Sequence, residues 1–446
     1  MSALLFTAGV VLVAIGLALS IALHELGHLV PAKAFGVRVT QYMIGFGPTL
    51  FSRRRGETEY GIKAFPLGGY IRMIGMYPPR KDDAPGTVRE DSTGFLQQMS
   101  EDAKEWEAAQ YDASEAHRTF VALSVPRKLV VMLGGPTMNL LISAFLMLVL
   151  ACGLGMPQLT TEVSAVSRCV LPADAPAGTS CHGHPDAPAA AAGIRPGDVV
   201  RSIDGHPTAD WDDVSAAIRE SGGRTVPVVV ERDGKSLTLR ATPILDERPV
   251  IDENGEAVRT ADGSLRTERT GFLGISPSTG LVRQSPTVVP GLVWTTFERT
   301  GQIVLSLPQR LVDVGRAAFG SEDRDPDGPI GVVGVSRLAG EVAAADEPGF
   351  DLREKVFTLV SMLASLNMAL FVFNLIPLLP LDGGHVAGAL VEGARRLLAR
   401  LRGRPDPGPV DMTRMLPVTN VVALVFIAMS LLLVYADIVK PVTLFP

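Results

Sequence analysis

The chain has 446 residues, of which 47% are hydrophobic and 20% charged, and its formal net charge is −6. Its mean hydropathy of +0.26 is high for a soluble protein and indicates a membrane protein that carries a polar domain. The arginine clusters adjoin apolar segments, so the composition excludes a typical nucleic-acid-binding protein, and no nucleic-acid partner is expected.

Residues 1–36 are predicted to form a membrane-spanning helix that carries a metal-binding motif. No charged residue occurs before His24, and the apolar run lacks the basic start of a signal peptide, so we expect a retained span. His24 and His28 share one face of a helix, a spacing at which two imidazoles can bind one Zn²⁺. Glu25, beside them, is placed to act as a general base. A chance H-E-x-x-H is disfavoured here, because ionisable groups at membrane depth are costly unless they are paired or ligated.

Residues 37–75 alternate apolar and polar side chains with interspersed glycines. This pattern predicts a membrane-associated β-hairpin or small sheet directly after the metal-binding helix. Residues 76–126 are polar, and Gln97–Thr119 is predicted to be a charged surface helix. Its lone histidine, His117, is expected to be solvated.

Three further apolar segments approach or exceed the length of a membrane span, at Leu129–Leu154, Val356–Leu381 and Leu416–Val434. We expect the sequence Gly134-Gly135-Pro136 to break Leu129–Leu154, the second of the four spans, near its start. With the first helix, these segments predict four transmembrane helices.

The distribution of charge predicts the topology. Residues 31–75 carry seven Lys and Arg against two Glu, and residues 385–415 carry six Arg against three acidic residues. By the positive-inside rule, both segments lie in the cytoplasm. Residues 155–350 and both termini are then extracytoplasmic.

A soluble α+β domain is predicted at residues 156–280. Two β-rich runs, Val226–Arg232 and Ser236–Thr242, meet at the turn Arg232–Lys235, and Trp211–Glu220 is predicted to be a helix. Residues 246–270 are expected to form a mobile hairpin, since they contain Asn-Gly and Asp-Gly turn signals.

Two features of the extracytoplasmic segment remain open from the sequence. Cys169 and Cys181 could pair if the domain faces an oxidising compartment. Residues 288–318 have helical apolar spacing, and this helix could lie along the outer membrane surface or pack on the domain.

A catalytic zinc normally takes three protein ligands, and Asp382 is the best third candidate. This carboxylate ends a 26-residue apolar run, where a metal is the strongest partner available. The prolines and glycines around it predict an unwound backbone, which is tolerated at membrane depth only where it is buried in protein or lines a wet cavity. The alternative is that Asp382 caps a helix end at the interface. His385 could be a further ligand or could support one.

Two motifs together resemble those of the site-2 protease family of intramembrane zinc metalloproteases. They are His24-Glu-Leu-Gly-His28 and Asn374-x-x-Pro-x-x-Pro-Leu-Asp382-Gly. The resemblance extends, in order along nearly the whole chain, to Ile44-Gly-Phe-Gly47, Phe65-Pro-Leu-Gly-Gly-Tyr70 and Gly135-Pro-x-x-Asn139.

This resemblance implies roles for individual residues. His24, His28 and Asp382 would bind zinc, and Glu25 would be the general base. Asn139 and Asn374 would position the substrate. Reasoning from the residues alone leaves the two asparagine roles open, since an asparagine at a helix crossing is as often structural.

The order of these segments is similar to that of the bacterial branch of the family that cleaves anti-sigma factors. Ala191–Gly205 resembles the core of bacterial PDZ domains, which implies a module that binds protein tails or excludes bulky substrates. The implied fold is a polytopic α-helical membrane protein with four transmembrane helices, a membrane-associated β-hairpin or sheet, and an extracytoplasmic PDZ-like α+β domain. The active site would face the cytoplasmic side of the cell membrane.

The implied function is hydrolysis of a peptide bond in or near the transmembrane helix of a single-span membrane protein, such as an anti-sigma factor. An upstream site-1 protease would make a first cut in the same substrate outside the membrane. The alternatives are a catalytically silent PDZ-bearing scaffold, which would not need Glu25, and a metal-ion transporter, which would need more intramembrane ligands.

The predicted segments are residues 1–36 (first span with the zinc motif), 37–75 (β region), 76–126 (cytoplasmic polar and helical segment), 127–155 (second span), 156–280 (PDZ-like domain), 281–350 (extracytoplasmic amphipathic helix and gate-like segment), 353–384 (third span), 385–415 (cytoplasmic basic loop) and 416–437 (fourth span).

Overall fold

The computed structural model describes residues 2–76, 90–92, 113–171, 179–250, 258–260, 264, 266–346, 350–410 and 415–443. The chain divides into two compact units. Unit 1 comprises Met1–Leu154 and Ser285–Pro446, and unit 2 comprises Gly155–Gln284, which includes the predicted soluble domain.

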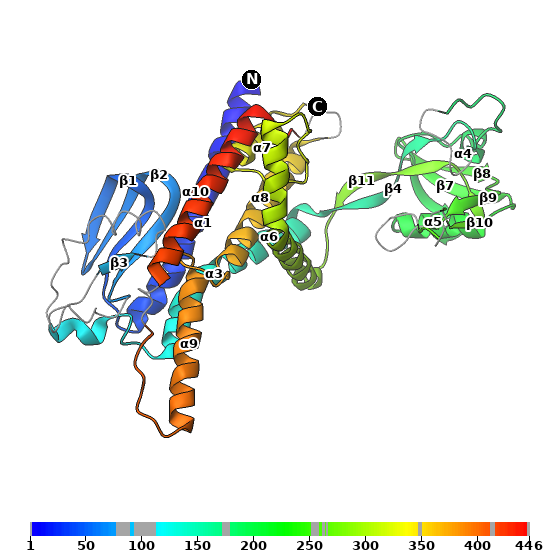
Figure 1. Cartoon of the computed structure of the whole chain (residues 1–446). Helices are drawn as coiled ribbons and strands as arrows, with labels where there is room; N and C mark the ends of the chain where they lie inside the picture. The colour runs from blue at the N-terminus through cyan, green and yellow to red at the C-terminus, as the bar shows by residue number, and fades with distance from the viewer. Residues whose placement is uncertain are drawn as a thin grey trace. The chain divides into compact units, whose positions relative to one another are not determined.

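Among the described residues of unit 1, four helices are long and apolar enough to cross a membrane (Figure 1). They are α1 (Ser2–Ala34), α3 (Val125–Leu148, continued by the π-helical turn η2 at Val149–Leu154), α8 (Leu352–Phe373) and α10 (Leu416–Val439). Less than a third of the most apolar window of each is buried inside the protein, so their outer faces suit lipid. The chain is therefore a multi-pass membrane protein.

The predicted break in the second span is wrong. Helix α3 continues through Gly134, Gly135 and Pro136 without interruption. Proline removes one backbone donor, but neighbouring helices in a membrane bundle can satisfy the freed groups. The two glycines serve close packing against α1, as described below.

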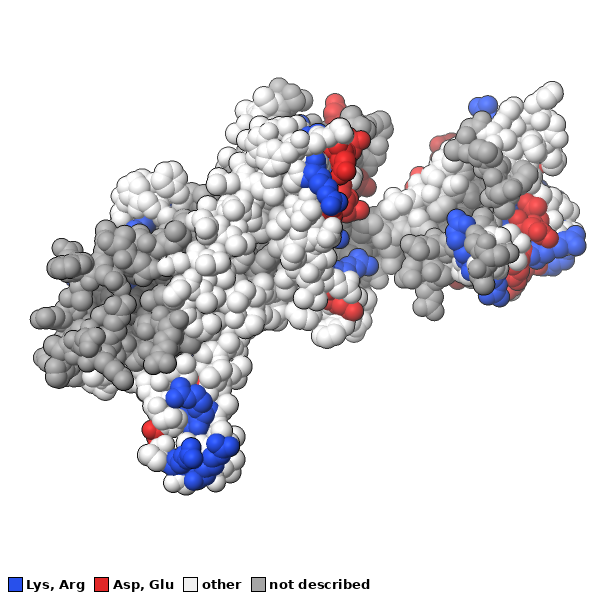
Figure 2. Space-filling view, viewed as in Figure 1, with Lys and Arg blue, Asp and Glu red and all other residues white. Residues whose placement is uncertain are grey.

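The unwound backbone predicted before Asp382 is confirmed, whereas the basic segment differs from the prediction. Helix α8 ends at Phe373, and residues 374–381, which contain Pro377 and Pro380, are not helical. The predicted basic loop begins as a helix, α9 (Asp382–Leu401), because its Ala, Leu and Arg residues are strong helix formers. Figure 2 shows Lys and Arg gathered at the far end of α9.

The predicted hairpin is confirmed, and it is folded back on itself. Strands β1 (Val39–Arg55) and β2 (Thr58–Ile74) are antiparallel, and β3 (Glu90–Ser92) pairs with the end of β2. Residues 41–44 of β1 pair with residues 69–72 on one side and residues 59–62 on the other, so the two long strands supply four sheet segments.

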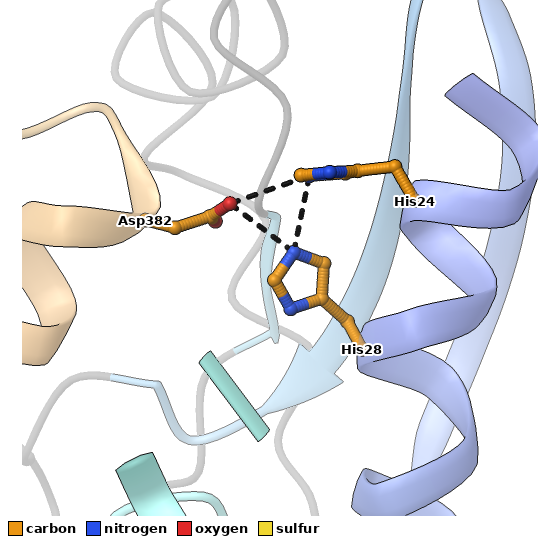
Figure 3. Close-up of side chains that lie close together, drawn as sticks. All are labelled: His24, His28 and Asp382. Carbon is orange, nitrogen blue, oxygen red and sulfur yellow. Dashed lines mark hydrogen bonds and ion pairs between the residues drawn. The ribbon is translucent and has the colours of Figure 1, made fainter. Parts of the chain in front are cut away.

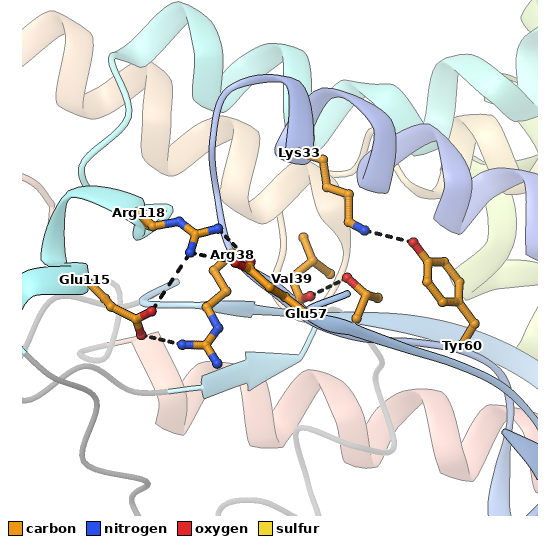
Figure 4. A network of polar contacts seen from close by, with 8 residues as sticks. Lys33, Arg38, Val39, Glu57, Tyr60, Glu115 and Arg118 are labelled. Atoms are coloured by element: carbon orange, nitrogen blue, oxygen red, sulfur yellow. Dashed lines mark hydrogen bonds and ion pairs between the residues drawn. The ribbon is translucent and has the colours of Figure 1, made fainter. Parts of the chain in front are cut away.

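A short 3-10 helix, η1 (Ala113–Arg118), is joined by ion pairs to residues just before β1 and in the turn between β1 and β2. Arg38 reaches Glu115 at 2.5 Å and Arg118 reaches Glu57 at 2.6 Å (Figure 4). This segment replaces the end of the predicted surface helix, and the earlier part of that prediction lies outside the described residues. His117 is exposed, as expected.

Two further described helices of unit 1 follow unit 2 in the chain. The 3-10 turn η3 (Pro286–Val288) leads into α6 (Val289–Phe319), which packs against α3, α8 and α10. Helix α7 (Val332–Ala344) packs against α1. Asp437 of α10 holds α7 in place: it accepts hydrogen bonds from Gly331 N and Gly334 N at 2.9 and 2.7 Å. Arg324 lies 2.8 Å from the same carboxylate, and both side chains are buried.

Unit 2 is built on one antiparallel sheet of order β11-β4-β5-β7-β8, with β6 paired to β5. A separate hairpin pairs β9 with β10. The predicted helix at Trp211–Glu220 and the predicted turn between β7 and β8 are confirmed. The elements are β4 (Met156–Val166), α4 (Pro188–Ala192), β5 (Val199–Ile203), β6 (His206–Pro207), α5 (Trp211–Glu220), β7 (Val226–Arg232), β8 (Lys235–Ala241), β9 (Ile244–Pro249), β10 (Thr267–Phe272) and β11 (Ile275–Val282).

Two connections fix the loops of unit 2. Cys169 and Cys181 form a disulfide, which answers the question the sequence left open. Asp198 is fully buried, accepts from Arg195 N at 2.8 Å, and pairs with Arg232 at 2.6 Å. The Arg232 guanidinium holds the pKa of Asp198 below its ordinary value.

Asp198→Asn is expected to lower the free energy of unfolding of unit 2 by about 2 kcal/mol at pH 7, since a hydrogen bond to a charged group contributes about 1.5–3 kcal/mol. Because the pKa of Asp198 is lower in the folded state, its contribution is present above the unfolded pKa and is lost as the pH falls through the folded value. The difference from wild type should therefore shrink only below about pH 4. Urea unfolding of the full chain, read by proteolysis of unit 2 at several pH values, measures this.

Asp204→Asn is the matched control. Asp204 pairs with Arg224 at 3.1 Å, but both side chains are partly exposed. Its removal should change the stability by no more than about 0.5 kcal/mol at any pH. Equal losses in the two variants would contradict the role assigned to Asp198.

Candidate metal centre

The centre begins with two histidines on one face of α1. His28 is fully buried, and the side chain of His24 is 12% exposed. The helix persists through them because α1 is an unbroken apolar run, and it ends just before Gly36, whose φ of +82° suits a helix terminus. Both rings thus project from one rigid segment, and their Nε2 atoms lie 3.2 Å apart.

Asp382 approaches this pair from α9. The non-helical residues 374–381 redirect the chain, so that Asp382 lies in the first turn of α9, and its side chain points at the two rings (Figure 3). Its Oδ2 lies 3.3 Å from the Nε2 of His24 and 3.3 Å from the Nε2 of His28. Within the described residues, these three are the only group of His, Cys, Asp and Glu whose donor atoms converge as a metal site would require.

The spacing of these three atoms fits zinc. A tetrahedral ion with bonds of about 2.0–2.1 Å separates its ligand atoms by about 3.3–3.4 Å, close to all three distances here. Asp382 Oδ2 is buried, yet it makes no hydrogen bond with any described residue. A buried carboxylate oxygen without such a bond is costly unless a cation satisfies it. Two imidazoles and one carboxylate are also a known donor set for catalytic zinc.

Helix α3 orients both rings. His28 Nδ1 lies 2.8 Å from the carbonyl oxygen of Val131, to which it can only donate. His28 Nε2 is then left with its lone pair, as a metal ligand requires. Asn139 contacts His24 Nδ1 at 3.0 Å, and its own Oδ1 has no partner among the described residues. With the side-chain amide turned over, that oxygen would accept from His24 Nδ1–H and leave His24 Nε2 as the ligand.

Glycines bring α3 close enough for these contacts. A Cβ on Gly135 would lie 2.1 Å from His28 Nε2, and a Cβ on Gly134 would lie 2.0 Å from the carbonyl oxygen of Gly27. Only glycine leaves room at these positions. The sequence pattern predicted that these glycines break the helix, and it held no signal for Val131. The glycine inside H-E-L-G-H, Gly27, was nevertheless a signal of close helix packing.

The remaining predicted residues, Glu25, Asn374 and His385, do not belong to the converging group. Glu25 is buried, and its Cγ would be 2.8 Å from a Cβ on Gly69 of β2, so the general-base candidate packs on the sheet. Asn374 is half-buried at the C-terminal cap of α8, and its side chain makes no hydrogen bond with a described residue. His385 is buried one turn after Asp382 but does not belong to the converging group.

Comparison with known proteins identifies similar chains. The model of peptidase family M50 matches residues 12–404. The zinc metalloprotease Rip1 of Mycobacterium tuberculosis is 34% identical over 451 residues, which cover 99% of this chain and 100% of the relative. The regulator of sigma-W protease RasP of Bacillus subtilis is 24% identical over 421 residues, which cover 83% of this chain and 87% of the relative.

Gly135→Ala is expected to weaken zinc binding about 10- to 100-fold, the range seen when the support of a metal ligand is lost, because the added methyl displaces the His28 ring. Zinc content after exposure to a graded chelator measures this. Gly153→Ala is the control, since its Cβ would meet only Val149 Cγ1 at 3.9 Å. Equal zinc retention in both variants would contradict the described fit at Gly135.

Proposed function

The chain belongs to peptidase family M50, the site-2 protease family, and from this premise we propose that it cleaves a peptide bond in or near the transmembrane helix of a single-span membrane protein. It is an intramembrane zinc metalloprotease of regulated proteolysis, as its relatives indicate. The single observation that carries the finer proposal is the convergence of His24, His28 and Asp382 beside a buried glutamate.

His24, His28 and Asp382 would hold the ion. Zinc bound there would polarise the scissile carbonyl and lower the pKa of a water molecule towards about 7. Val131 and Asn139 hold the two rings in the orientation that ligation needs. We therefore assign Asn139 to the support of His24 rather than to the substrate, and the proposed role of Asn374 in positioning the substrate rests on the family motif.

Glu25 is proposed as the general base. It adjoins His24 on α1, and burial against β2 restricts its side chain. Glu25 would take a proton from the attacking water and return it to the leaving amine nitrogen, so that one carboxylate serves both steps.

A helical substrate must unwind before its carbonyls can be attacked, and the sheet offers a means of holding it extended. Phe65 and residues 69–71 of β2 pair with β1 on one side, and β3 is the only described strand on the other side, reaching no further than Arg72. This edge includes Gly69, which packs on Glu25. Strand addition along it would bring an extended peptide beside the proposed base. Substrates rich in residues of low helix propensity near the cut should be preferred.

An anti-sigma factor is the proposed substrate. The Bacillus subtilis relative is named as a regulator of sigma-W, which favours a substrate of this class. We propose that an upstream site-1 protease first removes the extracytoplasmic part of that substrate, and that unit 2, as a PDZ-like module, binds the new tail or excludes uncut proteins.

The proposed topology places unit 2 outside the cytoplasm and the active site towards the cytoplasmic side. The disulfide Cys169–Cys181 supports this, since such bonds persist in oxidising compartments. The arginines at the end of α9 support it through the positive-inside rule (Figure 2).

Glu25→Gln is expected to reduce cleavage of a tagged single-span anti-sigma factor, truncated on its extracytoplasmic side, by at least about 100-fold, the lower range for loss of a general base. Zinc content should stay at the wild-type level, because Glu25 is not a proposed ligand. Cleavage by immunoblot and zinc by mass spectrometry, on the same purified samples, measure both.

Asp382→Ala is the matched control, expected to lose both zinc and cleavage. Wild-type cleavage by Glu25→Gln would refute the proposed base. If wild type held zinc but did not cleave the truncated anti-sigma factor, the proposed substrate class would be wrong.

Thiol labelling in intact cells tests the topology. In a Cys152→Ser background, Cys169 and Cys181 should stay unlabelled by a maleimide until the cells are treated with a reductant, because an extracytoplasmic disulfide is not reduced by glutathione. Labelling without reductant would place the domain in the cytoplasm and contradict the proposal.

A further inference from the structure

Helix α9 is joined to α3 by an ion pair inside the protein. Lys128 Nζ lies 3.0 and 2.8 Å from the two carboxylate oxygens of Glu392, and each side chain is 4% exposed. Arg396, one turn further along α9, also contacts Glu392 at 3.0 Å and lies 3.5 Å from Asp406. The pair lies about 15 Å along the axis of α9 from Asp382, so it touches neither the proposed ligands nor the general base.

One face of α3 therefore contacts His24, His28 and α9, the helix that carries Asp382. Lys128, Val131, Gly135 and Asn139 are buried and recur at helical spacing. Val131 holds His28, Asn139 holds His24, and Lys128 holds the helix of Asp382. Helix α3 thus contacts and supports both α1, which carries two of the proposed ligands, and α9, which carries the third.

The position of Asp382 depends more on such contacts than the positions of the two histidines do. The two histidines sit within one unbroken helix, whereas Asp382 follows eight non-helical residues, 374–381. The position of α8 therefore does not fix α9 through helical continuity, and α9 must be placed by its own contacts. A rotation of α9 about its axis would move Asp382 Oδ2 away from the two ring nitrogens.

We propose that Lys128 and Glu392 are positioning residues of the zinc site, which fix the rotation and the axial position of α9 and so hold Asp382 against His24 and His28. A charge pair in a low-dielectric interior suits this role, because a small displacement of α9 leaves the buried Lys128 without its partner, while Glu392 keeps Arg396. Apolar contacts depend less on direction, so they specify the rotation of a helix less sharply. The inference rests on the proposed assignment of Asp382 as a ligand.

The test compares the zinc release of purified full-length variants into a chromogenic chelator with their thermal unfolding. Lys128→Met is expected to release zinc about tenfold faster than wild type, the lower range for lost support of a ligand. Arg324→Met is the matched control, since it breaks the buried pair with Asp437 that holds α7. It should lower the unfolding temperature by a similar amount and release zinc at the wild-type rate.

The double variant Lys128→Met and Glu392→Met separates positioning from stability. Replacing both members of a buried pair by apolar residues commonly restores stability. The unfolding temperature should therefore recover, while zinc release stays fast, because two methionines do not fix the position of α9. Wild-type zinc release by Lys128→Met, or zinc release that follows the unfolding temperature across all three variants, would overturn the inference.

Asp382→Ala distinguishes this inference from the function on which it rests. If Asp382→Ala keeps its zinc as wild type does, the ligand assignment itself is wrong. If Asp382→Ala loses zinc and Lys128→Met retains it, the zinc site stands and only the positioning role falls.

Discussion

The close approach of α1 and α3 is the constraint on which the rest of the centre depends. Gly27 and Gly134 face each other with no room for a Cβ on either. Inside a bilayer there is little hydrophobic drive for helices to associate, so backbone proximity and interhelical hydrogen bonds must supply the affinity. At this separation a backbone carbonyl of α3 can reach an imidazole of α1, as Val131 does with His28. A pair of alanines at the crossing would push the helices apart and remove that contact.

This constraint explains why an enzyme that needs water can keep ionisable groups at membrane depth. His28 bonds the backbone carbonyl of Val131 and His24 contacts the amide of Asn139. Asp382 Oδ2 lies against the two ring nitrogens, where a bound cation would compensate its burial. The compensation comes from three segments far apart in the sequence, α1, α3 and the start of α9. The site is therefore a product of tertiary packing, although its motifs are local.

The motif residues were the part of the site that the sequence could predict. The four-residue spacing of His24 and His28 specifies one helix face by geometry alone, and a lone carboxylate at the end of an apolar run demands a partner. The support of these residues could not be predicted, since the partner of His28 is a main-chain carbonyl that any residue supplies. The break predicted at Pro136 was wrong because proline breaks helices chiefly in water-soluble proteins. In a membrane bundle, neighbouring helices can satisfy the backbone groups that proline leaves without a hydrogen bond. Residues 385–415 were predicted to be a basic loop from their arginine content. The helix α9 follows instead from their Ala, Leu and Arg residues, which are strong helix formers.

The connection of unit 2 to the rest of the chain has a consequence for how the protein can change. Unit 2 begins and ends in the paired strands β4 and β11, where Met156 lies opposite Val282. Unit 2 is thus inserted between η2 and η3 of unit 1, and its first and last strands are neighbours in one sheet, so its two ends lie close together. Insertions whose ends meet are tolerated because they impose no new distance on the host. Evolution can therefore enlarge, duplicate or exchange this module while the helices and the metal centre of unit 1 are inherited unaltered.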